Sequence, residues 1–213
     1  MNTTNLFVEL IVIGIGAATW IALFVFSFFG IGWVTSLETL FSFTVLIPAL
    51  SVVYVLGIIT DRIADFCFEK MRGNTLRSKW FQNINDYYRS RRLVYTGSER
   101  LGDLLEYGRS RMRICRGWAL NAVLILVSFN LFMSVQTPQI QNKPLLWLAA
   151  SLTLALFAGG SYFAWLNLTV AEYRKVKQHA EYVSSQRSPS HRHRGGRGGG
   201  REQGREQGRE QKR

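Results

Sequence analysis

Residues 6–29 read LFVELIVIGIGAATWIALFVFSFF, and Glu9 is the only charged residue among them. A helix rises about 1.5 Å per residue, so about 20 residues cross a hydrocarbon core of about 30 Å. Three further apolar runs follow, at residues 40–59, 118 to about 135, and 145–168. The sequence therefore predicts an all-α polytopic membrane protein with four transmembrane helices. Buried helices of a soluble protein are the alternative, and it is disfavoured by two runs above 20 residues without lysine or arginine.

The basic residues indicate the orientation of these helices. None of the 26 lysines and arginines precedes Arg62, and all but Lys143 fall within residues 62–116 or 174–213. The connections at residues 30–39 and 134–144 carry only Glu38 and Lys143 as charges. Cytoplasmic loops carry an excess of lysine and arginine. We therefore expect both termini and the segment between the second and third helices to be cytoplasmic.

The chain divides into four segments. Residues 1–59 hold the first two transmembrane helices, and residues 118–168 hold the other two. Residues 60–117 form a cytoplasmic helical segment with 13 basic and 7 acidic residues. Residues 169–213 form a basic cytoplasmic tail, which we expect to be disordered from about residue 184 because it has almost no apolar side chains to bury.

An amphipathic helix is predicted at residues 76–95. Its apolar side chains share one face, and arginines surround them. That composition is typical of a helix lying in an anionic headgroup layer, although packing on neighbouring helices is the alternative. The residues expected to contact lipid are Trp80, Ile84, Arg89, Arg91 and Arg92.

Two helical extensions beyond the membrane carry charges in matching register. One bears Asp61, Asp65 and Glu69, and the other bears Arg109, Arg113 and Arg116. If the helices run side by side and antiparallel, three ion pairs form a ladder: Asp61 with Arg116, Asp65 with Arg113, and Glu69 with Arg109. Two solvated charged faces are the alternative. Exposed pairs contribute only about 0.2–1 kcal/mol each, so such a ladder would set register more than stability.

Small residues indicate where helices pack closely. Gly14 and Ala18 lie four apart in the first run, and Ala155 and Gly159 lie four apart in the fourth. Such ridges let helices approach in lipid, either within the chain or between copies. Glu9 is the one carboxylate inside an apolar run, and we expect it to reach water near the interface rather than to carry a proton or cation. Asn121, Ser128 and Asn130 are expected to form interhelical hydrogen bonds.

The tail has two low-complexity features. Its period-four repeat, Gly-Arg-Glu-Gln at 200–211, resembles tandem-repeat expansions common in cyanobacterial genomes. That resemblance implies a bacterial inner membrane, with a cyanobacterium as one candidate source. The spacing of Arg194, Arg197 and Arg201 by glycine resembles an RGG box, which implies contact with nucleic acid through stacking and phosphate pairing. A solvated tail without this role is the favoured interpretation.

No catalytic motif stands out. The only histidines are His179, His191 and His193, all in the tail, where a preorganised site is hard to build. We therefore expect no enzyme activity, no cofactor and no metal. The favoured function is a membrane scaffold or accessory subunit that presents a basic surface to anionic lipids and assembles with itself or with other membrane proteins. A tether for RNA or other nucleic acid and a small oligomeric pore are the alternatives.

Overall fold

A computed structural model describes residues 3–30, 32, 43–136 and 142–187, and every regular element in that part of the chain is helical. In chain order the elements are α1 (Thr3–Phe29), α2 (Phe43–Phe68), the π-helical turn η2 (Glu69–Gly73), α3 (Asn74–Ser78), α4 (Ile84–Gly97), α5 (Glu99–Val135) and α6 (Lys143–Arg187).

Four of these helices are long and apolar enough to cross a membrane: α1, α2 with its continuation, α5 and α6. Between 24 and 44 residues fall in each candidate span. The prediction of an all-helical chain with four such helices is confirmed. These features support the class of a multi-pass, all-α membrane protein.

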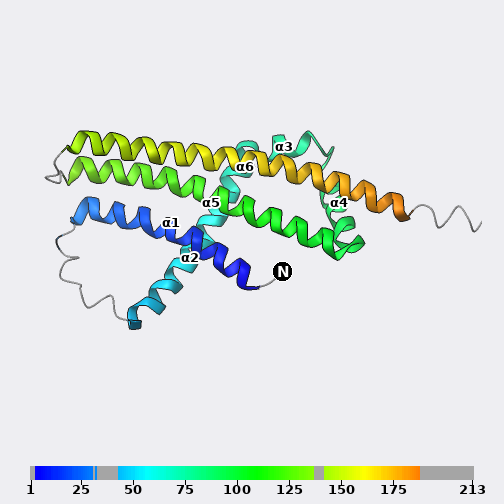
Figure 1. The fold of residues 1–213 in the computed structure, drawn as a ribbon, viewed down its shortest axis with the longest axis horizontal. Helices are drawn as coiled ribbons and strands as arrows, with labels where there is room; N and C mark the ends of the chain where they lie inside the picture. The colour runs from blue at the N-terminus through cyan, green and yellow to red at the C-terminus, as the bar shows by residue number, and fades with distance from the viewer. Residues whose placement is uncertain (1–2, 31, 33–42, 137–141, 188–213) are drawn as a thin grey trace, which may run out of the picture.

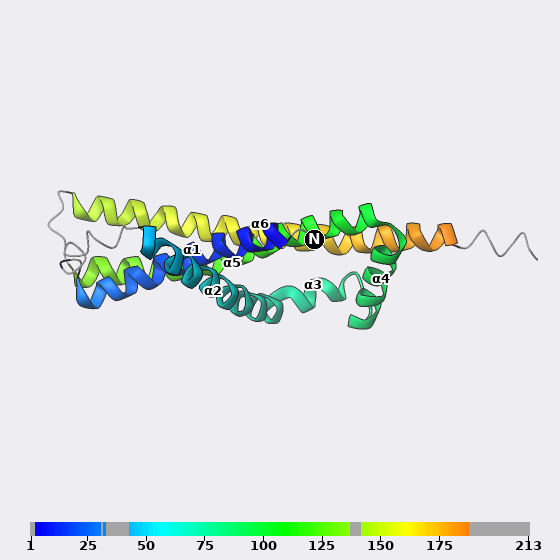
Figure 2. The same cartoon turned by 90° about the horizontal axis from the view of Figure 1, so that it is seen from below.

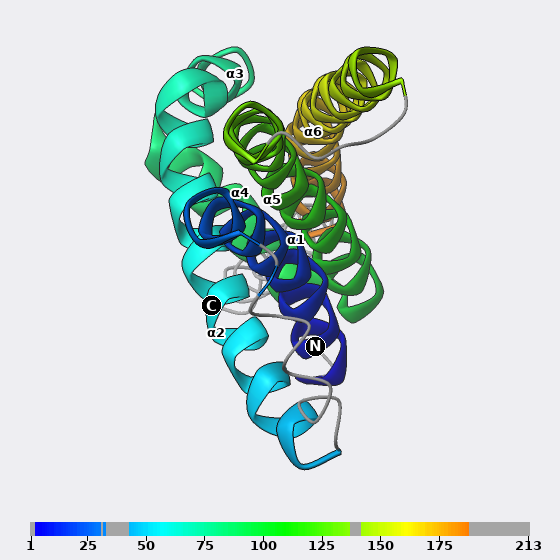
Figure 3. The ribbon, with the colours of Figure 1, turned by 90° about the vertical axis from the view of Figure 1, so that its left-hand side faces the viewer.

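The long helix α5 lies at the centre of the arrangement. It packs against α6 on one side and α1 on the other, and α1 in turn packs against α2 (Figure 1). The view along the bundle shows α5 between α1 and α6, with α2 inclined to the other three helices (Figure 3). The contacts of α2 with these neighbours extend from Val53, near its middle, to Phe68 at its carboxyl-terminal end.

Glycines permit the crossing of α1 and α2. A Cβ atom added at Gly14 would clash with the backbone carbonyl oxygen of Val53, and one added at Gly57 would clash with that of Leu10. The two backbones are therefore nearly in contact, which only residues without a side chain allow. Phe7 and Tyr54, whose ring centroids lie 5.0 Å apart, close the crossing on one side.

Two asparagines join α5 to its neighbours, as the sequence predicts. The fully buried Asn121 donates from Nδ2 to the carbonyl oxygen of Ile13 in α1, at 2.8 Å. Asn130 accepts on Oδ1 from Trp147 Nε1 at 2.7 Å and from Ser151 Oγ at 3.3 Å, both in α6. Polar side chains inside the apolar part of the bundle thus fix which helix faces meet.

The hairpin of α5 and α6 extends beyond the apolar part of the bundle. A helix of 45 residues, the length of α6, spans about 67 Å at 1.5 Å per residue, far more than a hydrocarbon core of about 30 Å. At the far end α4 packs beside the hairpin (Figure 2). A separate apolar core lies there, outside the apolar part of the bundle, and we call it the second core. It contains Phe81, Val94, Leu105, Val176 and Ala180.

The predicted single helix at residues 76–95 is wrong. The chain is helical in α3, leaves the helix at residues 79–83, and starts again as α4 at Ile84. Phe81, which lies in the break, is buried in the second core against Tyr87 and Tyr173. Burying this phenylalanine turns the chain back onto α6, and that tertiary contact overrides the continuous helical pattern.

Candidate functional site

The most distinctive site is a cluster of five charged side chains where α1, α2 and α5 meet. It consists of Glu9 from α1, Asp61 and Asp65 from α2, and Arg113 and Arg116 from α5. We call these five residues the charge cluster. It lies where the apolar runs of α1 and α2 give way to polar sequence, at the end of the bundle that carries most of the charged residues.

Each arginine of the charge cluster joins two carboxylates. Arg113 Nη1 donates to Glu9 Oε2 at 2.9 Å, and its Nε lies 3.8 Å from Asp61 Oδ2. Arg116 Nη2 donates to Asp61 Oδ1 at 2.9 Å, and its Nη1 donates to Asp65 Oδ1. Asp61 therefore bridges the two arginines, and three helices are held by one continuous network.

Burial makes this network energetically important. The side chains of Glu9 and Asp61 are only 6% and 7% exposed, and those of Arg113 and Arg116 are 18% and 16% exposed. Charges removed from water must be paired and hydrogen-bonded, because the desolvation cost is otherwise uncompensated. Three carboxylates face two guanidinium groups here, so the cluster itself does not supply the basic surface that the sequence predicts.

The ion pairs in the structure differ from those of the predicted ladder. Asp61 and Arg116 meet, but Asp65 also contacts Arg116, and Arg113 contacts Glu9 and Asp61. Glu69 lies in η2 and pairs with Arg77 at 3.1 Å instead of with Arg109. The predicted ladder required the two helices to run side by side. In the structure α2 crosses α5 obliquely (Figure 1), so Asp61 and Asp65 both reach Arg116.

The expectation for Glu9 is wrong for a related reason. Its residue is 5% exposed and its carboxylate is held by Arg113. The sequence shows a carboxylate three residues into an apolar run but cannot show that an arginine 104 positions later reaches it. Asn121 is likewise engaged in a contact between helices.

The four predicted helix-packing residues separate into two pairs. Gly14 is buried at the crossing with α2, and Ala18 beside it is half-buried. Ala155 and Gly159 are exposed on α6, and no atom lies within 4 Å of a Cβ built at Gly159. The sequence did not single out Gly57 or Gly117, which also lie against α1, because a close approach between two helices leaves no spacing pattern within one of them.

The five predicted lipid-contact residues also lie in different surroundings. Ile84, Arg89 and Arg92 are exposed on α4. Trp80 packs against the second core and under the guanidinium of Arg174, which lies 5.5 Å from its ring centroid. Arg91 is half-buried and stacks over Tyr95 at 5.3 Å.

Some predictions concern side chains outside this geometry. The predicted start of disorder at about residue 184 is wrong for the first residues of that stretch, because α6 continues as a helix to Arg187. The rest of the tail, with Arg194, Arg197, Arg201 and the tandem repeat, lies outside the described residues. Among the residues that are described, no three histidine, cysteine, aspartate or glutamate side chains gather closely enough to hold a metal ion.

A buried carboxyl group, Glu172, lies beyond the apolar run of α6, which ends at residue 168. The residue is 5% exposed and lies against Gly108 of α5. Burial raises the pKa of Glu172 from 4.5 to about 7, and the positive charges of Lys175, Arg109 and Arg91 offset only part of this effect. The folded protein therefore holds a proton on this group at pH values where the unfolded chain releases it.

We expect Glu172→Gln to stabilise the protein more at pH 8 than at pH 5. Because the pKa is raised on folding, the protonated group favours the folded state below about pH 4.5, and this contribution is lost as the pH rises through about 7. Glutamine cannot ionise, so the variant should avoid a loss of about 1–2 kcal/mol. Thermal unfolding in detergent, followed by circular dichroism at both pH values, measures the difference. Glu181→Gln, an exposed site on the same helix, is the control, and an equal pH dependence in all three proteins would contradict the prediction.

Comparison of the chain with protein-family models, curated proteins and solved structures found no match to any of them.

Proposed function

We propose that this protein is a non-enzymatic membrane scaffold or accessory subunit. In this proposal both termini and the segment between α2 and α5 face the cytoplasm, where the arginines and lysines of that segment and of the carboxyl-terminal tail meet anionic lipids. The helices α1, α2 and α5 form a rigid core, and α6 provides a face for a second membrane protein or another copy of the chain.

The observation that carries the proposal is the contrast between two sets of small residues. Gly14 and Gly57 lie in the contact between α1 and α2, within the chain. Ala155 and Gly159 present an equally small surface on α6, next to exposed Leu152 and Leu156, with open space at the Gly159 position. Small residues next to large ones let a second helix approach closely in lipid, where packing drives association.

The experiment is native purification in mild detergent, with the mass of the complex measured by light scattering. We expect a defined complex that survives deletion of the residues after Ser184, because assembly depends on the spans. Gly159→Leu should reduce the complex to smaller species, since its side chain occupies the space that a second helix would enter. Thr153→Leu is the control, because Thr153 is exposed on the same helix about 120° away at 100° per residue.

A monodisperse monomer from the wild-type chain, without any co-purifying protein, would contradict the proposal. Equal dissociation by Gly159→Leu and Thr153→Leu would remove the assigned face. Loss of assembly only on removal of the tail would favour instead a protein that acts through its basic carboxyl-terminal segment.

A further inference from the structure

A polar cavity of about 290 Å³ opens beside the charge cluster, between α2, η2, α3, α4, α5 and α6. Its wall includes six arginines and three acidic residues. The arginines are Arg62, Arg77, Arg91, Arg109, Arg113 and Arg116. Asp61, Asp65 and Glu69 are the acidic residues, so the wall carries an excess of positive charge.

The excess positive charge of the cavity wall comes from three of its six arginines. Arg77, Arg113 and Arg116 take up all three carboxylates of the wall through their ion pairs. Arg62 and Arg109 make no hydrogen bond or ion pair with any part of the chain that the structure describes, although the charges of Arg109 and Arg91 act on the buried carboxyl of Glu172. Arg91 contacts only aromatic residues, through its hydrogen bond of 3.4 Å to the Tyr95 hydroxyl and its position over that ring.

The remaining polar groups of the wall are mainly donors. Tyr87, Tyr88 and Tyr173 line the cavity, and their hydroxyl groups can each donate a hydrogen bond. Burial raises the pKa of Tyr173 to about 12, so this hydroxyl stays protonated at neutral pH. Arg116 Nε is buried without a hydrogen-bond partner among the described residues. A ligand that supplies several acceptor oxygens and negative charge would satisfy these donors.

The position of the cavity narrows the class of anion. Asp61 and Arg62 follow the apolar run of α2 after one intervening residue, and Trp165 and Thr169 of the wall flank the end of the apolar run of α6. Both runs end at the hydrocarbon boundary if these helices cross a bilayer. Lipid phosphates are the anions concentrated at that depth, and basic pockets between helices at this level suit phosphate-bearing headgroups.

We propose that this cavity binds an anionic phosphate group, and that Arg62, Arg91 and Arg109 are the residues that hold it. A guanidinium group presents paired N–H donors that match the oxygens of a phosphate. An anionic phospholipid headgroup is the expected source, and a soluble phosphate is the other source with the same chemistry. The site is separate from the small-residue face of α6, so the scaffold function does not depend on it.

The test uses the full chain in a neutral maltoside detergent at constant ionic strength. The probes are dioctanoyl phosphatidylglycerol, dioctanoyl phosphatidylcholine and inorganic phosphate, and the readout is the shift of the thermal unfolding midpoint. We expect phosphatidylglycerol to raise the midpoint in a saturable way and phosphatidylcholine to raise it far less. Arg109→Gln should weaken the apparent affinity about tenfold, because a charge-assisted hydrogen bond is lost.

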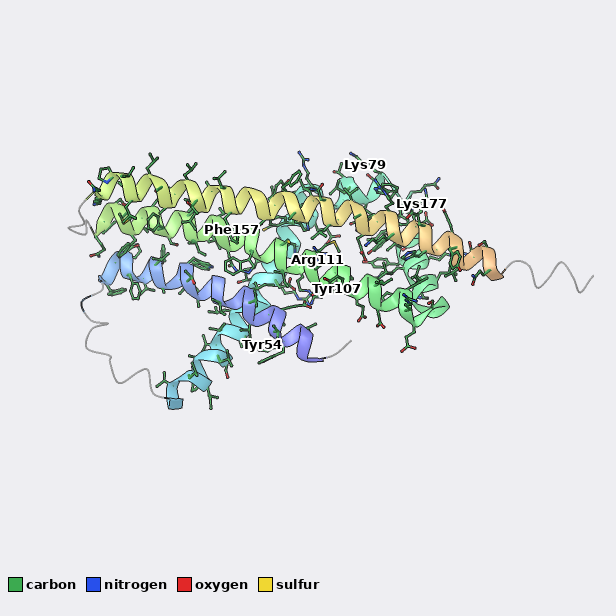
Figure 4. All side chains as sticks on the ribbon, in the orientation of Figure 1. Tyr54, Lys79, Tyr107, Arg111, Phe157 and Lys177 are labelled. Carbon is green, nitrogen blue, oxygen red and sulfur yellow. The ribbon has the colours of Figure 1, made fainter. Side chains whose placement is uncertain are left out.

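Arg111→Gln is the matched control. Arg111 lies two residues further along α5, is exposed, and stacks over Tyr107 at 5.7 Å outside the cavity (Figure 4). If Arg109→Gln does not fold, Arg62→Gln replaces it in the test, because Arg62 is exposed and its substitution should not affect folding. A saturable shift with inorganic phosphate at similar concentrations would assign the site to a soluble phosphate. Absence of any shift, a full shift retained by both cavity variants, or an equal loss in Arg111→Gln would overturn the proposal.

Discussion

Arg113→Gln is expected to lower the free energy of unfolding by about 3–5 kcal/mol, the cost of leaving a buried charge without its partner. The substitution removes the guanidinium that holds Glu9 at 2.9 Å, and the Glu9 side chain is only 6% exposed. Asp61 keeps Arg116 as its partner at 2.9 Å, so the loss falls mainly on Glu9. Denaturant unfolding of the protein in mixed micelles, followed by far-ultraviolet circular dichroism, measures the change.

A second substitution separates the unpaired charge from a simple loss of packing. Glu9→Gln, added to Arg113→Gln, should recover most of the lost stability, because two neutral amides carry no uncompensated charge. Arg111→Gln, an exposed site on the same helix, should change stability by no more than about 0.5 kcal/mol. If Arg113→Gln is as mild as this control, or if Glu9→Gln gives no recovery, the charge cluster does not hold the three helices together.

Gly57→Ala is expected to destabilise the protein by about 3 kcal/mol, at the upper end of the cost of overpacking. The new methyl group would clash with the backbone carbonyl oxygen of Leu10. A backbone atom cannot turn aside as a side chain can, so α1 and α2 would have to separate along the crossing. The same change at Gly14, which faces the Val53 carbonyl oxygen, should have a similar effect.

The chain offers a matched control for this prediction. Gly160→Ala is the same chemical change in an apolar helix, but nothing lies within 4 Å of the added atom. Gly160 lies about 100° around the helix from Gly159, away from the face proposed for assembly. Alanine is a better helix former than glycine by about 0.5–1 kcal/mol, so this variant should be neutral or slightly stabilised. Thermal unfolding of the three variants in one detergent compares them directly. Equal effects at Gly57 and Gly160 would show that helix propensity, and not the close crossing, controls stability at these glycines.

Both predictions depend on contacts between helices that are distant in sequence. Glu9 and Arg113 lie 104 positions apart, and Leu10 and Gly57 lie on different spans. No periodicity within one helix identifies such partners. The sequence indicated Gly14 by its spacing from Ala18, but it gave no reason to single out Gly57.

The amphipathic segment shows a second limit. The helical pattern at residues 76–95 correctly predicts the two short helices α3 and α4, but not the break between them. The break at residues 79–83 is set by the burial of Phe81 against Tyr173 of α6. A local pattern cannot show that one of its own apolar residues gains more by packing on a distant helix than by continuing the helix.

By itself, the sequence determined the class of the protein, because hydrophobic length and charge are local properties. Runs of about 20 apolar residues must be helical in a bilayer, where every backbone N–H and C=O group needs a partner within the segment. It also identified Asn121 and Asn130 as interhelical contacts and Asp61 and Arg116 as neighbours just beyond the apolar runs. Only the tertiary structure decided that α2 crosses obliquely at Gly14 and Gly57. That crossing angle brings Asp61 and Asp65 onto the same arginine and buries Glu9 against Arg113. It also leaves Arg62 and Arg109, beside the cavity, without an ion pair among the described residues, because side-chain partners depend on where helices meet in space.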